Sequence, residues 1–272
     1  MAVPYQTTGL PYPASNEYPL DFHLEVARKN VSGMDDVGKF GRNIEIDIGN
    51  TADIWDGGNQ GNISLIWVPP TTARAHVIAS TNANDTDGGT GLRTVRVYGL
   101  TAWDGDFVSE DLTMNTGTPP TTINDYVIIH RMQALTWGSA GPNIGVVTAT
   151  ANTDATVTAL MRVGEGQSQM AIFGVPGGRT AYMTRLYANL NRNGGSATGG
   201  MDVALKLNPI PDSQLLGYIT KHTFSVNMAG TSAFSIPHVS LRVYDGPCIL
   251  KIQATSDTNN LDLSAGFDLT IE

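Results

Sequence analysis

Short runs of alternating apolar and polar residues follow one another along this chain, and turn-forming residues separate them. From residue 64 onward the runs recur at intervals of roughly 8–15 residues, with Gly, Pro and Asn between them. Alternation with a period of two is typical of β-strands that have one buried face, whereas helices repeat their apolar residues every three or four positions. The pattern therefore predicts an all-β fold of antiparallel sandwiches or jelly rolls. The predicted strands are Ser64–Val68, His76–Ser80, Thr94–Tyr98, Asp106–Met114, Tyr126–Thr136, Val146–Thr150, Val157–Met161, Met170–Val175, Ala181–Asn191, Met201–Leu207, His222–Met228, Val239–Tyr244, Cys248–Ser256 and Phe267–Ile271.

A turn-and-strand phrase occurs twice and indicates how the chain divides. Gly89–Leu100 reads as a Gly-rich turn, Arg-Thr and then an apolar strand, and Gly177–Tyr187 follows the same order. A small, polar stretch, Asn152–Thr156, lies between the two copies. We therefore expect two tandem antiparallel β-sandwich or jelly-roll-like domains, preceded by an extended N-terminal arm. The expected boundaries are 1–57 for the arm and lead-in segment, 58–155 for the first sandwich and 156–272 for the second.

The first 20 residues contain four prolines and three tyrosines. Each proline bars a helix and biases the residue before it toward extended conformations. Such a stretch cannot bury itself, so it is either a disordered tail or an arm that orders against a neighbouring subunit. In the second case its tyrosines are the anchors. These tyrosines are Tyr5, Tyr12 and Tyr18.

Residues 21–31 are the one plausible helix near the start of the chain. Asp21 can cap such a helix, and basic residues stand near its C-terminal end. Apolar residues also alternate in this stretch, which leaves a strand open as the alternative. Glycines at positions 33, 38 and 41 then predict a loop, and alternating isoleucines predict a strand over Arg42–Ile48.

The composition favours a protein that packs against neighbours. Hydrophobic residues make up 41% of the chain, enough for extensive cores, and charged residues only 15%, against about 25% in ordinary globular proteins. The net charge is −9, and the 16 Lys and Arg residues are scattered. Because phosphate binding needs clustered cations, we expect no nucleic-acid partner.

Membrane and disulfide chemistry are not expected either. No apolar run approaches the ~18–20 residues that a membrane helix needs, and the N-terminus lacks the basic start and apolar centre of a signal peptide. We therefore expect no membrane partner. The single cysteine, Cys248, cannot form an internal disulfide, and its apolar neighbours predict a buried side chain.

No arrangement of residues typical of catalysis is found. The five histidines fall in no metal-ligand spacing, the carboxylates form no pair suited to acid–base work, and there is no nucleophile elbow. We predict that the protein is not an enzyme and uses no cofactor. The loop Asn82–Gly88 is the best cation candidate, because its side-chain oxygens alternate and Gly88 permits a sharp turn. It lacks a closing glutamate, and the same residue types form turns without an ion, so no metal site is assigned.

Several phrases together resemble a known family. They are Val37–Asn43, Asp53–Gly58, Ala79–Thr86 followed by Gly89–Gly91, Gly164–Gln167, Val175–Tyr182 and Leu263–Leu269. The chain from residue 21 to 272 resembles a family of β-rich structural proteins of tailed bacteriophages, many from marine hosts, whose place on the virion is usually unassigned. The resemblance implies a β-rich virion component, and the lack of a signal peptide pattern predicts that it is made in the host bacterial cytoplasm. It brings no catalytic residues with it.

These expectations lead to one functional hypothesis and several alternatives. The first is a capsid decoration or cement protein on the outer shell, bound to the major capsid protein or other virion proteins and forming a homo-oligomer, with a trimer favoured. The expected contact residues are Tyr5, Tyr12, Tyr18, Phe22, Phe40, Arg42 and Trp55. The alternatives are a receptor- or glycan-binding fibre module with tryptophans stacked on sugars, a depolymerase, and a jelly-roll capsid protein.

Overall fold

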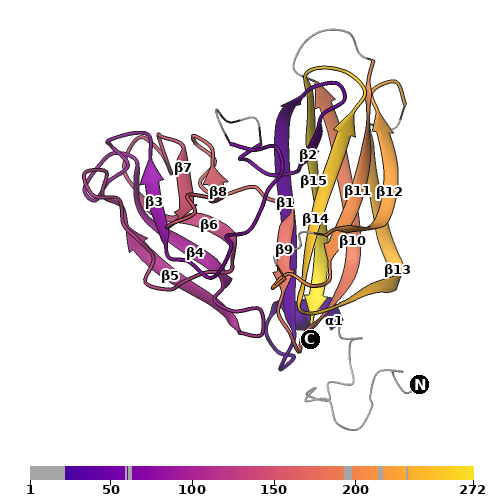
Figure 1. Cartoon of the computed structure of the whole chain (residues 1–272), viewed down its shortest axis with the longest axis horizontal. Helices are drawn as coiled ribbons and strands as arrows, with labels where there is room; N and C mark the ends of the chain where they lie inside the picture. The colour runs from indigo at the N-terminus through magenta and orange to yellow at the C-terminus, as the bar shows by residue number, and fades with distance from the viewer. Residues whose placement is uncertain (1–21, 59, 61–62, 193–197, 214–216, 231) are drawn as a thin grey trace, which may run out of the picture.

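A computed structural model describes residues 22–58, 60, 63–192, 198–213, 217–230 and 232–272. Within these residues the chain forms one short helix and 15 strands, and every paired strand is antiparallel (Figure 1), so the all-β prediction is confirmed. No helix in this part of the chain is long and apolar enough to cross a membrane. The elements are α1 (Phe22–Ala27), β1 (Asp35–Ile46), β2 (Thr51–Asp53), β3 (His76–Ser80), β4 (Leu92–Leu100), β5 (Phe107–Thr113), β6 (Ile128–Trp137), β7 (Val147–Ala151), β8 (Val157–Met161), β9 (Ile172–Val175), β10 (Thr180–Arg192), β11 (Gly200–Asn208), β12 (Ile219–Asn227), β13 (Ala233–Asp245), β14 (Cys248–Ser256) and β15 (Leu261–Ile271).

The larger of two sandwiches consists of β1, β2 and β9–β15. One sheet has the strand order β1-β15-β10-β13, and the other has the order β12-β11-β14-β2 with β9 also paired to β14. Alternate residues of each strand point into the shared core, as Phe267, Leu269 and Ile271 of β15 do. Residues 267–271 were predicted from sequence to form a strand, and these three side chains are fully buried.

The smaller sandwich consists of β3–β8. Its two sheets have the strand orders β3-β7-β8 and β5-β4-β6. Its core includes Val95 and Val97 of β4 together with Val147 and Ala149 of β7. The repeated sequence phrase leads into β4 in this sandwich and into β10 in the larger one, and both are inner strands with a neighbour on each side. The phrase therefore indicates a turn before an inner strand in both cases.

The smaller sandwich is inserted into the larger one between β2 and β9, which corrects the tandem boundaries expected from sequence. Strand β1 pairs with β15 along almost its whole length and β2 pairs with β14, so residues 35–46 and 51–53 are strands of the larger sandwich and not a lead-in segment. Strand β8 pairs with β7, so residues 157–161 belong to the smaller sandwich. The two sandwiches stand side by side (Figure 1). The expected arm, residues 1–20, lies outside the described residues.

Two local predictions were wrong. The glycines at positions 38 and 41 were expected in a loop, but both lie within β1. A Cβ atom at Gly41 would lie 2.2 Å from the backbone oxygen of Ile54 and 2.4 Å from the backbone nitrogen of Ala171, so this glycine permits three chain segments to cross. The predicted strand at 64–68 is irregular, and the N–H of Trp67 donates to the Asp53 carboxylate (2.8 Å) instead of to a neighbouring strand.

The cores of the two sandwiches meet at β9. Both faces of this strand are buried. Phe173 packs in the core of the larger sandwich, whereas Ile172 packs with Ile249 in the core of the smaller one. The strand therefore forms a common wall, and the two units share an apolar junction.

Candidate functional site

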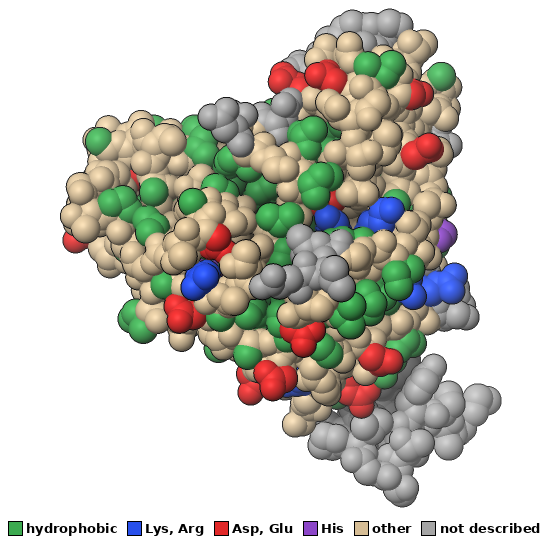
Figure 2. Space-filling view, in the orientation of Figure 1, with side chains coloured by type: hydrophobic (Ala, Val, Ile, Leu, Met, Phe, Trp, Pro, Cys, Tyr) green, Lys and Arg blue, Asp and Glu red, His purple; other side chains and the backbone are tan. Residues whose placement is uncertain are grey.

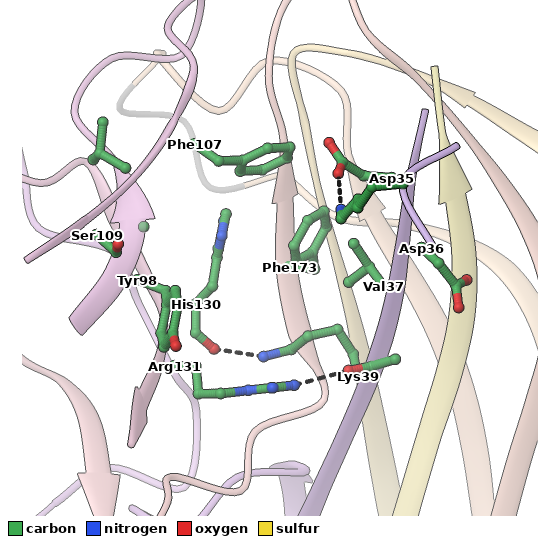
Figure 3. A pocket seen from close by; sticks show the side chains of 14 residues that line it. Asp35, Asp36, Val37, Lys39, Tyr98, Phe107, Ser109, His130, Arg131 and Phe173 are labelled. Carbon is green, nitrogen blue, oxygen red and sulfur yellow. Dashed lines mark hydrogen bonds and ion pairs between the residues drawn. The ribbon is translucent and has the colours of Figure 1, made fainter. Parts of the chain in front are cut away.

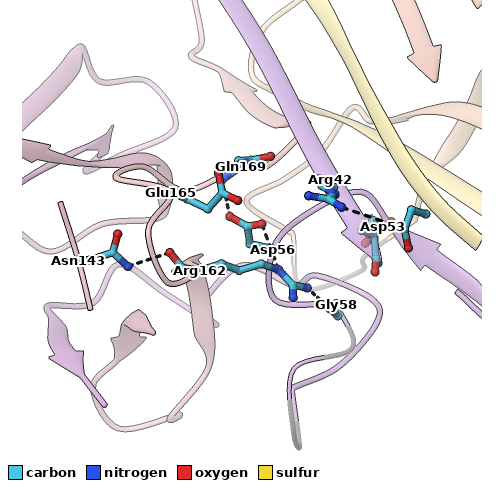
Figure 4. A network of polar contacts seen from close by, with 10 residues as sticks. Arg42, Asp53, Asp56, Gly58, Asn143, Arg162, Glu165 and Gln169 are labelled. Atoms are coloured by element: carbon cyan, nitrogen blue, oxygen red, sulfur yellow. Dashed lines mark hydrogen bonds and ion pairs between the residues drawn. The ribbon is translucent and has the colours of Figure 1, made fainter. Parts of the chain in front are cut away.

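A network of polar contacts fixes the two chain segments that connect the sandwiches (Figure 4). Asp56 follows β2 on the outgoing segment, and Arg162 follows β8 on the returning one. The Nε atom of Arg162 lies 3.4 Å from a carboxylate oxygen of Asp56, and its Nη2 atom donates to the carbonyl of Gly58 (3.0 Å). The N–H of Gln169 donates to the other Asp56 oxygen (2.7 Å). Asp56 therefore holds both connecting segments at once.

Burial controls the ionisation of this network. Asp56 is almost fully buried, and loss of hydration raises the pKa of its carboxyl to about 7, although the Gln169 N–H and Arg162 act in the opposite direction. Burial also lowers the pKa of Arg162, partly offset by Asp56. The junction thus contains a carboxyl group that titrates close to neutral pH.

A second buried pair lies in the larger sandwich. The ammonium of Lys251 lies 2.6 Å from the carboxylate of Asp53, which also accepts from the Trp67 N–H (2.8 Å) and the Gln253 amide (3.0 Å). The Lys251 ammonium lies 4.0 Å from the centre of the Tyr218 ring. Because every partner is a protein group, this cluster orders β14 against β2 and the segment that leads to Trp67.

A cavity of about 650 Å³ opens between the sandwiches (Figure 3). It is bordered by β1 of the larger sandwich, by β4, β5 and β6 of the smaller one, and by β9. Phe107, His130 and Phe173 form an aromatic wall, with the His130 ring centre 4.4 Å from Phe173 and 5.7 Å from Phe107. Lys39 and Arg131 also line it. This is a concave site of the size that small ligands occupy.

Two strands of the larger sandwich are edge strands that no other described strand covers. β13 ends one sheet and β12 ends the other, on the side away from the smaller sandwich (Figure 1). Apolar side chains stand exposed on both strands: Ile219 of β12 is 53% exposed, and Leu241 and Val243 of β13 are 45% and 54% exposed. Phe224 and Phe234 stack at 4.1 Å and join the two strands. On the face drawn in Figure 2, Lys and Arg side chains form separate spots and no continuous basic field.

The contact residues expected from sequence are not brought together. Phe22 lies on α1 and is exposed, while Phe40 and Arg42 lie on β1, where they are half-buried and Arg42 contacts Asp262 (3.4 Å). Trp55 is 1% exposed and packs in the core of the smaller sandwich, so the expected partner contact at Trp55 is wrong. Its large apolar ring fills the junction between the sandwiches. The position of Trp55 beside a turn had suggested an exposed side chain. The remaining three, Tyr5, Tyr12 and Tyr18, lie outside the described residues.

The loop considered for a cation is organised by one buried carboxylate. Asp85 is fully buried and accepts from the Ser80 hydroxyl (2.6 Å) and from the N–H groups of Leu92 (2.8 Å), Ile144 (3.0 Å) and Gly145 (2.8 Å). Donor hydrogens occupy the positions that a cation would need. In the described residues no group of three or more His, Cys, Asp or Glu side chains is arranged to hold a metal.

The tryptophans and the cysteine have separate surroundings. Trp67 is buried in the core, and its indole N–H donates to the carbonyl of Thr158 (2.8 Å). Trp137 is 50% exposed at the end of β6, so the sugar-stacking alternative stays a prediction for that residue. Cys248 is buried as expected, and burial raises the pKa of its thiol to about 12.

Sequence reasoning missed Lys39, Asp56 and His130 as site residues. Lys39 lies in β1 within a stretch that was expected to be a loop, and His130 is one of five histidines that showed no metal-ligand spacing. No local sequence pattern marks Lys39 or His130, because the cavity forms only when the smaller sandwich packs beside β1 and β9 of the larger one.

Comparisons with known proteins identify no family. No protein-family model matches the chain, and no curated protein matches it. One similar solved structure is that of infectious bursal virus derived T=1 particles, at 8% identity and a TM-score of 0.18, covering 88% of this chain and 69% of that one. A TM-score of this size carries no argument about fold or function.

Proposed function

We propose that the protein is a non-enzymatic structural component of a bacteriophage virion, and most specifically a decoration or cement protein on the capsid shell. The observation that carries the proposal is the pair of uncovered edges, β12 and β13, with exposed apolar side chains. An uncovered edge strand presents unpaired N–H and C=O groups that another chain can pair with. The all-β architecture is compatible with such a role.

The edges carry part of the protection that monomeric sheet proteins use. Natural edges are usually blunted by charged side chains, especially lysine, or by proline. Along β12 the only charged residue is Lys221, and β13 carries Arg242 and Asp245. Pro237 interrupts the middle of β13, so a ladder along the whole strand is barred. The contact we propose therefore centres on Leu241 and Val243.

The occupant of this surface is a second copy of the chain, in a homotrimer. The N-terminal arm and the major capsid protein complete the proposed assembly, with the arm tyrosines as anchors on the shell. An apolar side chain that is half exposed in an isolated subunit gains about 1 kcal/mol or more when a neighbour covers it. Several such contacts, repeated by symmetry, are the expected source of particle stability.

The test compares two substitutions of equally exposed valines. Val243→Asp places a charge on the β13 surface, and Val163→Asp places the same charge on the smaller sandwich, where Val163 is 55% exposed. Light scattering after size-exclusion chromatography measures the mass of the full chain and both variants. We expect oligomers for the unmodified chain and for Val163→Asp, and monomers for Val243→Asp with unchanged circular dichroism. A monomeric unmodified chain, or oligomers for all three proteins, would refute the role of this edge.

A further inference from the structure

The cavity between the sandwiches contains a buried ammonium without a carboxylate partner. Lys39 points inward from β1 and is 3% exposed. Among the described residues, the one hydrogen bond of its ammonium goes to the carbonyl oxygen of His130 (2.5 Å), and none of the ion pairs includes it. An ammonium has three donor hydrogens, so two remain for another partner. Burying such a group without a counter-charge is unfavourable.

A second cation stands beside it. Arg131 follows His130 on β6, and its Nη2 atom donates to the carbonyl of Gly38 (2.9 Å), which is also an uncharged partner. Figure 3 shows the Lys39 and Arg131 side chains lying along one side of the cavity. Burial, with a smaller contribution from the positive charge of Arg131, holds the pKa of Lys39 well below its usual value. An anion bound here would offset both effects.

The carboxylates of the cavity rim do not supply that anion. Asp35 pairs with Lys29, and Asp36 lies on the exposed outer face of β1, pointing away from His130 (Figure 3). Neither carboxylate therefore offsets the charges of Lys39 and Arg131. A ligand that fills the cavity must bring the negative charge itself.

The opposite wall favours a flat, apolar body. Phe107, His130 and Phe173 present ring surfaces. The Nε2 atom of His130 accepts from the Gly174 N–H (3.2 Å), which places the proton of the neutral ring on Nδ1, and burial keeps the pKa of this histidine well below its usual value. The histidine is thus uncharged, and with Phe107 and Phe173 it makes this wall of the cavity aromatic and apolar.

We infer that this cavity binds a small organic monocarboxylate that carries a planar ring, with the carboxylate at Lys39 and Arg131 and the ring against the aromatic wall. The ligand class follows from the cavity alone and does not depend on the virion role. Assembly through β12 and β13 can fail while binding is retained, and the reverse also holds.

The experiment uses the full chain and four probes: benzoate, benzamide, acetate and inorganic phosphate. Benzamide keeps the ring of benzoate without its charge, and acetate keeps the charge without the ring. Binding at neutral pH is followed by two-dimensional NMR of the backbone amides. We expect saturable shifts around the cavity with benzoate, and affinities at least about tenfold weaker for the other three probes.

Substitutions then locate the site. Lys39→Met retains the length of the side chain and removes the buried charge, so it should fold, and it should weaken benzoate binding at least about tenfold. Lys206→Met is the control, since Lys206 is a lysine of the larger sandwich whose ammonium bonds to Thr220 outside the cavity. If Lys39→Met does not fold, Arg131→Met serves instead, with weaker benzoate binding expected and unchanged benzamide binding. Absence of benzoate binding, equal binding of benzoate and benzamide, or full binding by the folded Lys39→Met or Arg131→Met protein would overturn the inference.

Discussion

Replacing Asp56 with asparagine should change how the stability of the protein depends on pH. Burial raises the pKa of this carboxyl from 3.8 to about 7 in the folded protein, while the unfolded chain keeps the ordinary value. The folded state therefore binds the proton more tightly. The stability that Asp56 contributes is fully present below pH 3.8 and is lost as the pH rises through about 7.

The magnitude follows from this difference. Between the two pKa values the free energy of unfolding falls by about 1.4 kcal/mol per pH unit for one proton. From pH 5.5 to 7 the loss is therefore about 2 kcal/mol, and little more is lost above that. Asparagine cannot ionise, yet its side-chain oxygen can still accept from the Gln169 N–H. The variant should lack this loss of stability.

The assay is urea unfolding of both proteins at pH 5.5 and 8.5. Burial lowers the pKa of His76 to about 4, so its contribution to stability is lost as pH falls below 6.5, opposite in sign to that of Asp56. Because both proteins contain His76, this effect cancels when their free energies are subtracted. The expected result is that the free energy of unfolding of the variant, relative to that of the unmodified protein, is about 2 kcal/mol higher at pH 8.5 than at pH 5.5. If the free energies of unfolding of the two proteins differ by the same amount at both pH values, the argument that burial raises the pKa of Asp56 is refuted.

Two other predictions concern packing and reactivity. Gly41→Ala should lower the free energy of unfolding by about 3 kcal/mol or more, because the added Cβ would meet immobile backbone atoms. Gly38→Ala in the same strand is the control and should be tolerated, because the nearest atom to its added Cβ lies at 3.5 Å. Urea unfolding compares the two variants, and equal losses of stability would contradict the crossing of three segments at Gly41. Cys248 should not react with iodoacetamide in the native protein at pH 8 and should take up one label in urea, as measured by mass; rapid native labelling would show that the thiol is accessible.

Strand positions could be read from the sequence because alternation is a local property. The last strand shows this, since its buried Phe267, Leu269 and Ile271 stand at every second position. The partner of a strand leaves no such trace. β1 pairs with β15 across more than 200 residues of chain, and nothing in the lead-in sequence predicts that neighbour. The insertion of the smaller sandwich was missed for the same reason.

The candidate site was less predictable than the fold. The inward positions of β1 include Lys39, Gly41 and Asn43, so the usual apolar signal of a buried face is missing there. Lys39 is buried because the inserted sandwich covers it, and Gly41 is required because two other segments cross it. Both facts arise from tertiary contacts. Trp55 illustrates the converse, since an aromatic residue beside a turn was expected to contact a partner and instead fills the junction.

The most direct test of the proposed virion role is cryo-electron microscopy of particles purified from a host culture that produces the chain. The account predicts density for both sandwiches at fixed positions on the capsid shell, with the β12 and β13 edges against a neighbouring subunit. Particles that lack the chain, or that carry it with both edges facing solvent, would contradict the account.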